Sequence, residues 1–423
     1  MAEATRAIAR ARLENGFRIL SERSGSMPLF TALLCVEAGS RYDPPSRHGL
    51  SAATAGTLLE GAGSLSSTEL ALSVESLGAE IDVASGYETV TIATMGPVGC
   101  LDDILAIMFE IARAPRFSRL ETVLDRQRSE IAEERDDPYQ VCQRALFETI
   151  YGRHPRARSP SGDPDGIAAI RDADVRSFHE QRYVPDRCTL AIVGDIDPES
   201  AGGLAAARAD DWHPGGRPLD DPLPPRRRKV ASARLVRMAC RQTHLCVGHL
   251  GIPLLDSRYE AFQVLDAILG DCAGFGARLA KRLRESEGLA YVVESDTTDT
   301  AGLDPGLFRA YTATSPESVG AALGGIREEF ARVVDEAPSP KEVEAAVAYL
   351  VGRRLVENET IEGRAARLLQ VERYGLGLDS DDSYASRLAS IRPQDVHAAA
   401  ESLIDLEGMS VVAVGPALPS LSI

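Results

Sequence analysis

The stretch "IRDADV", residues 170–175, returns as "IRPQDV" at residues 391–396, an offset of 221 positions. At the same offset, "TLAIVG" (189–194) matches "SVVAVG" (410–415). Repeated matches at one fixed offset indicate an internal duplication of the chain. A period this long predicts two similar domains and not a solenoid, whose units are several times shorter.

Residues 211–230, "DWHPGGRPLDDPLPPRRRKV", separate the two halves. The segment is rich in proline, glycine and charge and lacks hydrophobic periodicity, which is typical of an interdomain linker. The chain has 423 residues, enough for two domains. We therefore expect an N-terminal domain over 1–210, a linker over 211–230 and a C-terminal domain over 231–423.

Strand-like and helix-like stretches are interleaved within each half. The β-branched stretch "ETVTIATM" (88–95) predicts a strand, and "CTLAIVGDI" (188–196) predicts a buried one that closes the first half. Between the early strands, residues 66–77 predict a helix that Ser66 or Ser67 caps, with a glutamate two or three positions on. Helices that alternate with strands in this order favour an α+β fold with helices packed against one sheet.

Composition excludes several classes of protein. A net charge of -17 argues against a nucleic-acid partner. The seven cysteines are scattered and show no C-x-x-C spacing, which favours reduced thiols in a cytoplasm over disulfides or a zinc ribbon. The N-terminal stretch lacks the apolar core of a signal peptide, and no run approaches a membrane span of roughly 18 apolar residues. We expect a cytoplasmic protein with no membrane partner.

The stretch "RESEGLAY", residues 284–291, sets an arginine and a tyrosine seven positions apart. Residues 274–287 have helical periodicity, and Gly288 follows where a glycine commonly ends a helix. Arg284 is therefore expected in the last helical turn and Tyr291 near the start of the next strand. From these residues alone, a structural role explains the pair better than a functional one: the arginine complements the helix C-terminus, and the tyrosine suits an amphipathic strand.

Longer stretches resemble the insulinase, or mitochondrial processing peptidase, family of pitrilysin-like inverzincins. Residues 268–295, "ILGDCAGFGARLAKRLRESEGLAYVVES", resemble its second-domain signature, a helix ending in Arg with a Tyr seven residues on. Residues 36–51 resemble the approach to its zinc helix, and residues 129–138 the helix bearing its third metal ligand. The resemblance covers nearly the whole chain. It implies two homologous α+β domains, each a mostly antiparallel sheet with helices on one face, forming half of a clamshell.

The metal-binding residues of that family are missing. Its enzymes carry His-x-x-Glu-His on a helix, where two histidines bind zinc and the glutamate activates a water molecule. Aligned on the leading Gly-Leu, these places fall on Ala52, Ala55 and Gly56. Glu130 aligns with the third ligand and is left alone. Because catalytic zinc takes three protein ligands, we expect no cofactor in this chain and no peptide hydrolysis by the chain alone.

The histidines do not offer a replacement site. No two of the seven are four positions apart, the spacing that places two ligands on one helical face. His244 and His249 lie five apart on a predicted strand, so their rings should point to opposite faces of the sheet. His48 precedes the expected zinc helix and is expected in a turn.

In the family, the active site is shared between two similar halves. The resemblance implies that Arg284 and Tyr291 reach the zinc site of a partner chain. We therefore expect a non-zinc subunit of a heterodimeric zinc endopeptidase, with a homologous His-x-x-Glu-His partner that brings the zinc and a peptide as substrate. The alternatives are a catalytically silent scaffold and a peptide-binding or chaperone-like member of the same family.

Overall fold

The computed structural model describes residues 7–25, 27–214, 221–227, 231–271 and 276–416. The chain forms two compact units, each assembled from three segments. Unit 1 comprises Met1–Ala132, Arg158–Pro222 and Val356–Leu378, and unit 2 comprises Glu133–Ala157, Leu223–Leu355 and Asp379–Ile423. The predicted linker contains one crossing between the units, at Pro222–Leu223. In addition, each half of the sequence contributes one helical segment to the other unit: Glu133–Ala157 belongs to unit 2, and Val356–Leu378 belongs to unit 1. The predicted boundaries at 210 and 231 treat each domain as continuous and do not include this exchange.

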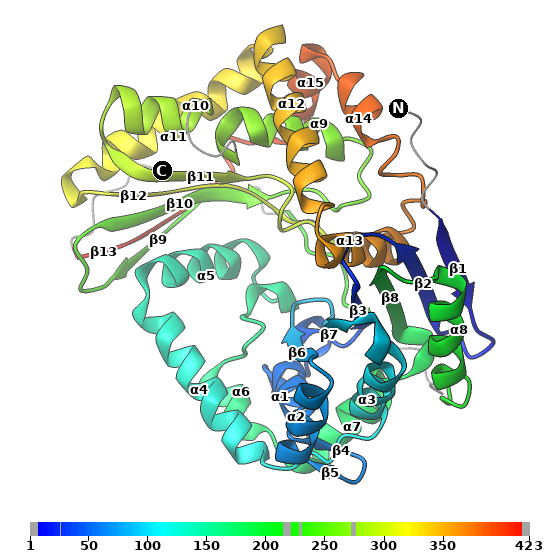
Figure 1. Ribbon diagram of the computed structural model, residues 1–423. Helices are drawn as coiled ribbons and strands as arrows, with labels where there is room; N and C mark the ends of the chain where they lie inside the picture. Colours follow the sequence, from blue (N-terminus) through cyan, green and yellow to red (C-terminus); the bar gives the residue numbers. More distant parts are fainter. Residues whose placement is uncertain (1–6, 26, 215–220, 228–230, 272–275, 417–423) are drawn as a thin grey trace. The chain divides into compact units, whose positions relative to one another are not determined.

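Unit 1 contains a six-stranded sheet in the order β1-β2-β8-β3-β7-β6 (Figure 1). One pair, β2 with β8, is parallel, and the other four pairs are antiparallel. The strands are β1 (Ile8–Arg12), β2 (Arg18–Arg23), β3 (Leu29–Val36), β6 (Glu80–Ser85), β7 (Val90–Pro97) and β8 (Cys188–Gly194). A separate hairpin joins β4 (Gly61–Ala62) and β5 (Leu65–Ser66).

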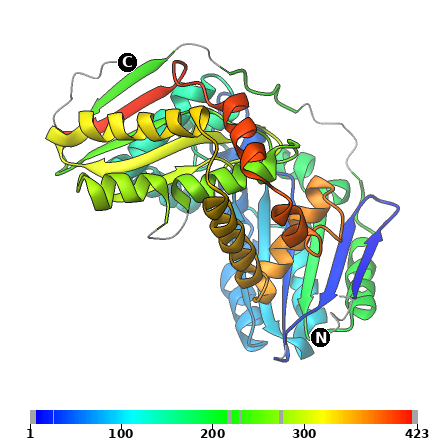
Figure 2. The same ribbon diagram turned by 90° about the horizontal axis from the view of Figure 1, so that it is seen from above.

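Unit 2 contains a five-stranded sheet in the order β11-β12-β10-β13-β9 (Figure 1). Its strands are β9 (Ser232–Arg237), β10 (Thr243–Leu250), β11 (Ala290–Asp296), β12 (Leu307–Thr314) and β13 (Ser410–Gly415). Again one pair, β13 with β9, is parallel. Read from β11, the order repeats that of β6-β7-β3-β8-β2. The duplication is thus present in the topology, and β1, dark blue in Figure 2, is the additional strand of unit 1.

One face of each sheet carries helices from its own half of the sequence. In unit 1 these are α1 (Leu50–Thr57), α2 (Ser67–Ser76), α3 (Leu101–Arg113), α4 (Leu120–Asp136), α6 (Pro164–Ala169), α7 (Asp172–Arg182) and α8 (Pro198–Ala209). Their apolar stripes meet the sheet in one core around Phe17, Phe30 and Ile92. The predicted cap of α2 is present as a capping box between Ser66 and Glu69. The α+β prediction is confirmed.

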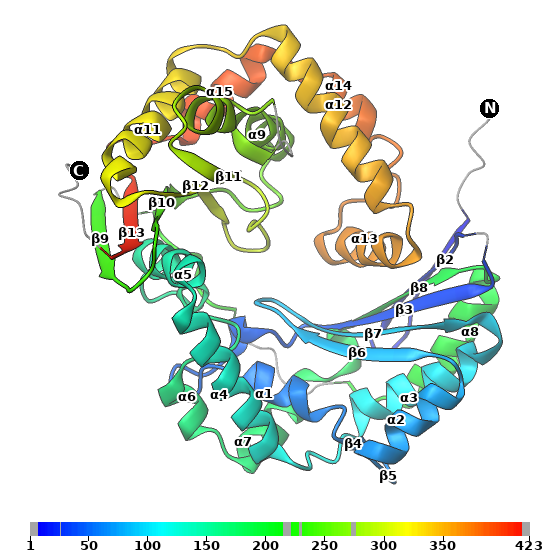
Figure 3. The same cartoon turned by 60° about the vertical axis from the view of Figure 1, so that its left-hand side comes forward.

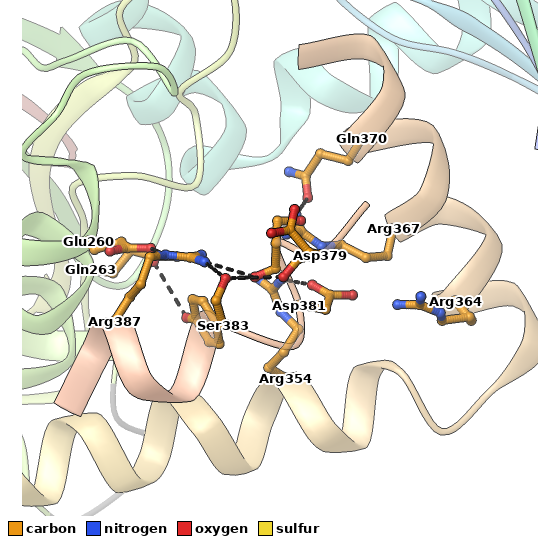
Figure 4. A network of polar contacts seen from close by, with 12 residues as sticks. Glu260, Gln263, Arg354, Arg364, Arg367, Gln370, Asp379, Asp381, Ser383 and Arg387 are labelled. Atoms are coloured by element: carbon orange, nitrogen blue, oxygen red, sulfur yellow. Dashed lines mark hydrogen bonds and ion pairs between the residues drawn. The ribbon is translucent and has the colours of Figure 1, made fainter. Parts of the chain in front are cut away.

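In unit 2 the corresponding helices are α9 (Tyr259–Asp266), α11 (Val319–Asp335), α12 (Pro340–Glu357), α14 (Tyr384–Ala389) and α15 (Pro393–Leu403). They cover the face of the sheet around Phe308 (Figure 1). Polar contacts fasten α14 to α9, with Arg387 Nε 2.6 Å from Glu260 Oε1 (Figure 4). None of the helices in the described part of the chain is long and apolar enough to cross a membrane.

The second face of each sheet is covered by a helix from the opposite half of the sequence. In unit 1, α13 (Ile361–Tyr374) packs Leu368 and Leu369 against β3 and β8 (Figure 3). A buried ion pair joins α13 to β2, with Arg364 Nε 2.8 Å from Glu22 Oε2. In unit 2, α5 (Pro138–Tyr151) packs an apolar and sulfur-containing stripe, including Cys142, onto the other sheet. The sequence predicted helices on one face of each sheet. The structure has helices on both faces, and the helix on the second face comes from the other half of the sequence.

Candidate functional site

Helix α1 carries Ala52, Ala55 and Gly56, the positions aligned in the sequence with a zinc motif, and a buried carboxylate fixes its start. Asp43 accepts hydrogen bonds from the backbone N–H of Gly49 at 2.7 Å and of Ser51 at 2.8 Å. Gly49 has φ +95°, a left-handed conformation that favours glycine. Burial raises the pKa of Asp43 to about 7, although both N–H bonds favour its charged form. Asp43 was missed in the sequence because it lies six positions before the residue it caps.

A pocket of about 220 Å³ opens beside α1. It is lined by Ala52, Ala55, Gly56, Val83, Ser85, Val123, Arg126, Gln127, Glu130, Pro160 and Ser161. The structure therefore brings Glu130 of α4 into one pocket with Ala52, Ala55 and Gly56 of α1. Glu130 is 74 or more positions from each of these three residues in the sequence. Val83 and Ser85 come from the edge strand β6, so the pocket lies between two helices and a sheet edge.

The lining of this pocket does not fit a zinc ion. Among these eleven residues, Glu130 carries the one carboxylate, and none is histidine or cysteine. Helix α1 presents Ala52, Ala55 and Gly56, which have no ligand atom in their side chains. The amide Nε2 of Gln127 donates to the carbonyls of Gly49 at 3.0 Å and Ser161 at 2.6 Å. Zinc prefers nitrogen and sulfur ligands and needs at least three from the protein.

The pocket is also too narrow at α1 for the residue that the motif requires. A Cβ atom built on Gly56 would lie 2.6 Å from Cγ1 of Val123, far inside van der Waals contact. Glycine at this position thus permits a close approach of α1 and α4. Arg126, which also lines the pocket, has its Nη2 3.5 Å from Glu60 Oε1, so the pocket carries a basic side chain.

Arg284 lies in a short helical segment of unit 2. The segment begins as α10 (Arg278–Ala280) and continues as a π-helical turn over Lys281–Ser286. Gly288 follows with φ +62°, as predicted for a glycine that ends a helix. The Arg284 side chain is 27% exposed, and its Nη2 lies 3.9 Å from Glu285 Oε1. Residues 274 and 275, the first two of the predicted helix, lie outside the described residues.

Tyr291 lies on β11, an edge strand, at a β-bulge. Ala290 pairs with Thr314 and Val293 pairs with Thr312, so Tyr291 and Val292 together stand opposite Ala313. A bulge of this kind re-aims side chains and interrupts strand pairing. Tyr291 is 82% exposed, and it is the one aromatic residue among the exposed large hydrophobic side chains of the described residues. The turn at Gly288 separates the exposed phenol of Tyr291 from the guanidinium of Arg284 along the chain.

A group of three carboxylates in unit 2 is explained without a metal ion. Ligand atoms of Asp266, Asp296 and Asp299 lie within 4.8 Å of one another, the one such group found among the described residues. Asp266 accepts from Ser295 Oγ at 2.5 Å, and Asp296 accepts from Arg309 Nε at 3.2 Å. These bonds tie β11 to α9 and β12.

The histidines of β10 behave as the strand period predicts. His244 Nδ1 lies 2.9 Å from the hydroxyl of Tyr311, within the layer that α5 covers. His249 stacks on Phe308 in the layer on the other face, at 5.1 Å between ring centroids. Burial lowers the pKa of His249 to about 4. His48 lies in the turn before α1, as expected.

Two units of one topology define a duplicated α+β protein, with a pocket beside α1 and an arginine and a tyrosine near β11. A family model described as Insulinase (Peptidase family M16) matches residues 18–163, and one described as Peptidase M16 inactive domain matches residues 169–350. The chain belongs to the insulinase, or M16 peptidase, family. The resemblance seen in the sequence is confirmed.

Related proteins cover almost the same length. An uncharacterized zinc protease of Streptomyces coelicolor is 28% identical over 421 residues, 97% of this chain and 90% of the relative. One of Bacillus subtilis is 24% identical over 378 residues, covering 85% of this chain and 87% of the relative.

Solved structures share the fold. The crystal structure of a peptidase M16 inactive domain from Pseudomonas fluorescens has a TM-score of 0.90 at 24% identity, over 97% of this chain and 98% of the other. The crystal structure of a protease from Helicobacter pylori has a TM-score of 0.87 at 16% identity, over 97% and 99%. At these identities the likeness concerns the fold.

Proposed function

We propose that this chain is the non-zinc subunit of a heterodimeric zinc endopeptidase and that it supplies Arg284 and Tyr291 to the active site of its partner. The partner is a homologous chain with His-x-x-Glu-His, which brings the zinc. The observation that carries the proposal is the contrast between the two sites. The pocket beside α1 lacks the ligands for zinc, whereas β11 presents Tyr291 to solvent on a bulge.

The chemistry of the pair suits a role in trans. When water attacks a peptide carbonyl at a metal, the carbonyl oxygen gains negative charge. A guanidinium and a phenol both donate hydrogen bonds to such an oxygen, and a preorganised donor of this kind lowers the barrier by about 2.7–4 kcal/mol. Arg284 also has the planar fork that holds a carbonyl or carboxylate in one orientation.

The names of the relatives support membership of a proteolytic system. The two described above are called zinc proteases, while the matched Pseudomonas fluorescens structure is called an M16 inactive domain. A chain of this family without zinc ligands fits an assembly in which one subunit holds the metal. The expected substrate is an unfolded peptide, because an extended chain can add to a sheet edge.

Co-expression with a zinc-bearing homologue, followed by assays on quenched-fluorescence peptides, tests the proposal. Each subunit alone should be inactive, and the complex should cleave with chelator sensitivity. Arg284→Ala or Tyr291→Phe in this chain should lower kcat about 100-fold or more while the complex still assembles. Lys281→Ala, an exposed substitution on the same helical segment, is the matched control. Full activity of both variants in an intact complex would favour the silent-scaffold alternative.

A further inference from the structure

The helical turn that carries Arg284 is wider than an α-helical turn. Residues Lys281–Ser286 form a π-helical segment, in which each backbone N–H bonds the carbonyl five positions earlier. The N–H of Glu287 donates to the carbonyl of Arg282 at 3.0 Å, and the hydroxyl of Ser286 donates to that of Lys281 at 3.0 Å. Single π turns inside helices are uncommon and are often found at functional sites.

A salt bridge with the same five-residue spacing spans this turn. Arg282 Nε lies 3.0 Å from Glu287 Oε1. On an α-helix, side chains three or four positions apart are neighbours, whereas side chains five apart diverge around the axis. On the wider turn, residues five apart lie closer to the same face than they do on an α-helix. The π turn therefore favours the contact between Arg282 and Glu287.

The same arginine fastens the turn to the neighbouring helix α11. Its Nη2 lies 2.5 Å from Glu328 Oε2, and its Nη1 lies 3.4 Å from Glu329 Oε1. Leu283, the next residue, is fully buried against Gly325, where an added Cβ would lie 2.7 Å from Leu283 Cδ2. Two successive residues thus hold the turn in place immediately before Arg284.

We infer that Arg282 and Glu287 are positioning residues, a clasp that selects the π turn and so sets the direction of the Arg284 guanidinium. Relaxation to an α-helix changes the register by one residue, which rotates the following side chains by about 100° around the axis. Such a rotation would carry Arg284 away from its present direction. The functional part of this inference rests on the proposed role of Arg284 at the partner's zinc site, and the geometric part does not.

The first test uses activity of the assembled complex. Glu287 is exposed, so Glu287→Ala removes the clasp without opening a cavity. It should lower kcat about 10-fold or more with KM unchanged, because misplacing an oriented group by about 1 Å costs up to roughly 100-fold. Glu287→Gln keeps an acceptor for Arg282 Nε and should recover most of the loss. Glu328→Ala, the matched control, removes another carboxylate from the same guanidinium and should stay within about twofold of the parent.

The second test is a crystal structure of the Glu287→Ala chain. The expected result is an α-helical turn at residues 281–286, with the bond from residue 287 to the Arg282 carbonyl replaced by one to Leu283. An unchanged π turn would overturn the clasp. The clasp would also be overturned if Glu287→Ala left kcat unchanged while Arg284→Ala was inactive. An equal loss of kcat in Glu287→Ala and Glu328→Ala would overturn it as well. If Arg284→Ala itself keeps full activity, the proposed function fails, and the crystal structure still decides the geometric part.

Discussion

The two sheets share one strand order but differ at the edge strands β6 and β11. Strand β6 pairs with β7 in unbroken register from Glu80 to Ser85, beside the pocket of α1. Strand β11 pairs with β12 through a bulge at Tyr291 and Val292. The central strands β8 and β13, by contrast, are buried along their whole length. Interior strands are buried on both faces, so their residues are restricted to the same apolar kind in both units. The two units therefore differ at their edge strands, where a bulge can change which side chains are exposed.

The exchanged helices give the largest expected difference between the units. Helix α13 is held to its sheet by the Arg364–Glu22 pair, whose side chains are 3% and 1% exposed. Arg364→Met removes the buried ion pair with Glu22 and should lower the free energy of unfolding by about 3–5 kcal/mol. Urea denaturation followed by circular dichroism measures this loss.

Two further variants control that experiment. The double variant Glu22→Leu with Arg364→Met removes both charges and should regain most of the stability. Glu148→Ala on α5 breaks the pair with Arg234, whose side chains are 44% and 42% exposed, and should cost less than about 1 kcal/mol. Equal losses from Glu148→Ala and Arg364→Met would remove the distinction between the two helices.

Deleting Val292 makes β11 resemble β6. One residue would then face Ala313 instead of two, so the strand would regain an unbroken register and Tyr291 would be re-aimed. We expect kcat of the zinc-bearing complex to fall about 100-fold, as for Tyr291→Phe. Val292→Ala keeps the bulge and should retain activity. A deletion variant that assembles and remains fully active would show that the bulge does not serve Tyr291.

Rebuilding the zinc motif on α1 tests whether the pocket beside β6 lacks zinc because its ligands are missing. Ala52→His, Ala55→Glu and Gly56→His supply the missing groups beside Glu130, but the new side chain at position 56 meets Val123. Adding Val123→Ala makes room for the histidine at position 56 and should raise the zinc affinity about tenfold over that of the triple variant. Tenfold is the lower end of the effect of residues that surround metal ligands. Dialysis followed by metal analysis measures both. The parent chain should retain no stoichiometric zinc, and equal binding by the triple and quadruple variants would contradict the steric argument.

The stability of the protein should depend on pH through Asp43. Burial raises its folded-state pKa from 3.8 to about 7, so its contribution is full below about pH 4 and is lost as the pH rises through 7. Asp43→Asn should therefore flatten the decline of Tm between pH 5 and pH 8. Asp197, which caps α8, is the control of opposite sign, because its bonds to Ser200 lower its pKa. A Tm profile for Asp43→Asn parallel to that of the parent would contradict the assignment.

Much of the architecture was predictable because its signals are local. The capping box of α2, the closing strand β8 and the turn at Gly288 each follow from a few adjacent residues. The alignment of α1 with Glu130 was predictable only through the family resemblance, and the structure then brings those residues to one pocket. The roles of Arg284 and Tyr291 stay predictions.

The features that escaped the sequence depend on distant or competing contacts. No local pattern distinguishes α13 as a partner of β3 and β8, because its apolar stripe would suit any sheet. The π turn around Arg284 has the same apolar spacing as an α-helix, and the contact across it joins Arg282 to Glu287, a spacing of five that no α-helical pattern contains. The bulge at Tyr291 is a matter of register between two strands, which alternating residues alone do not fix.

The exchange of α13 has a consequence for synthesis on the ribosome. Strand β8 ends at Gly194, whereas α13 ends at Tyr374, 180 residues later in the chain. At roughly 5–20 residues per second, that interval lasts about 10–35 seconds. During it, the apolar face formed by Leu20, Leu33 and Val193 has no covering helix, although every strand of its sheet has already been made. The nascent chain therefore presents a nearly finished sheet with one exposed apolar face until the missing helix emerges.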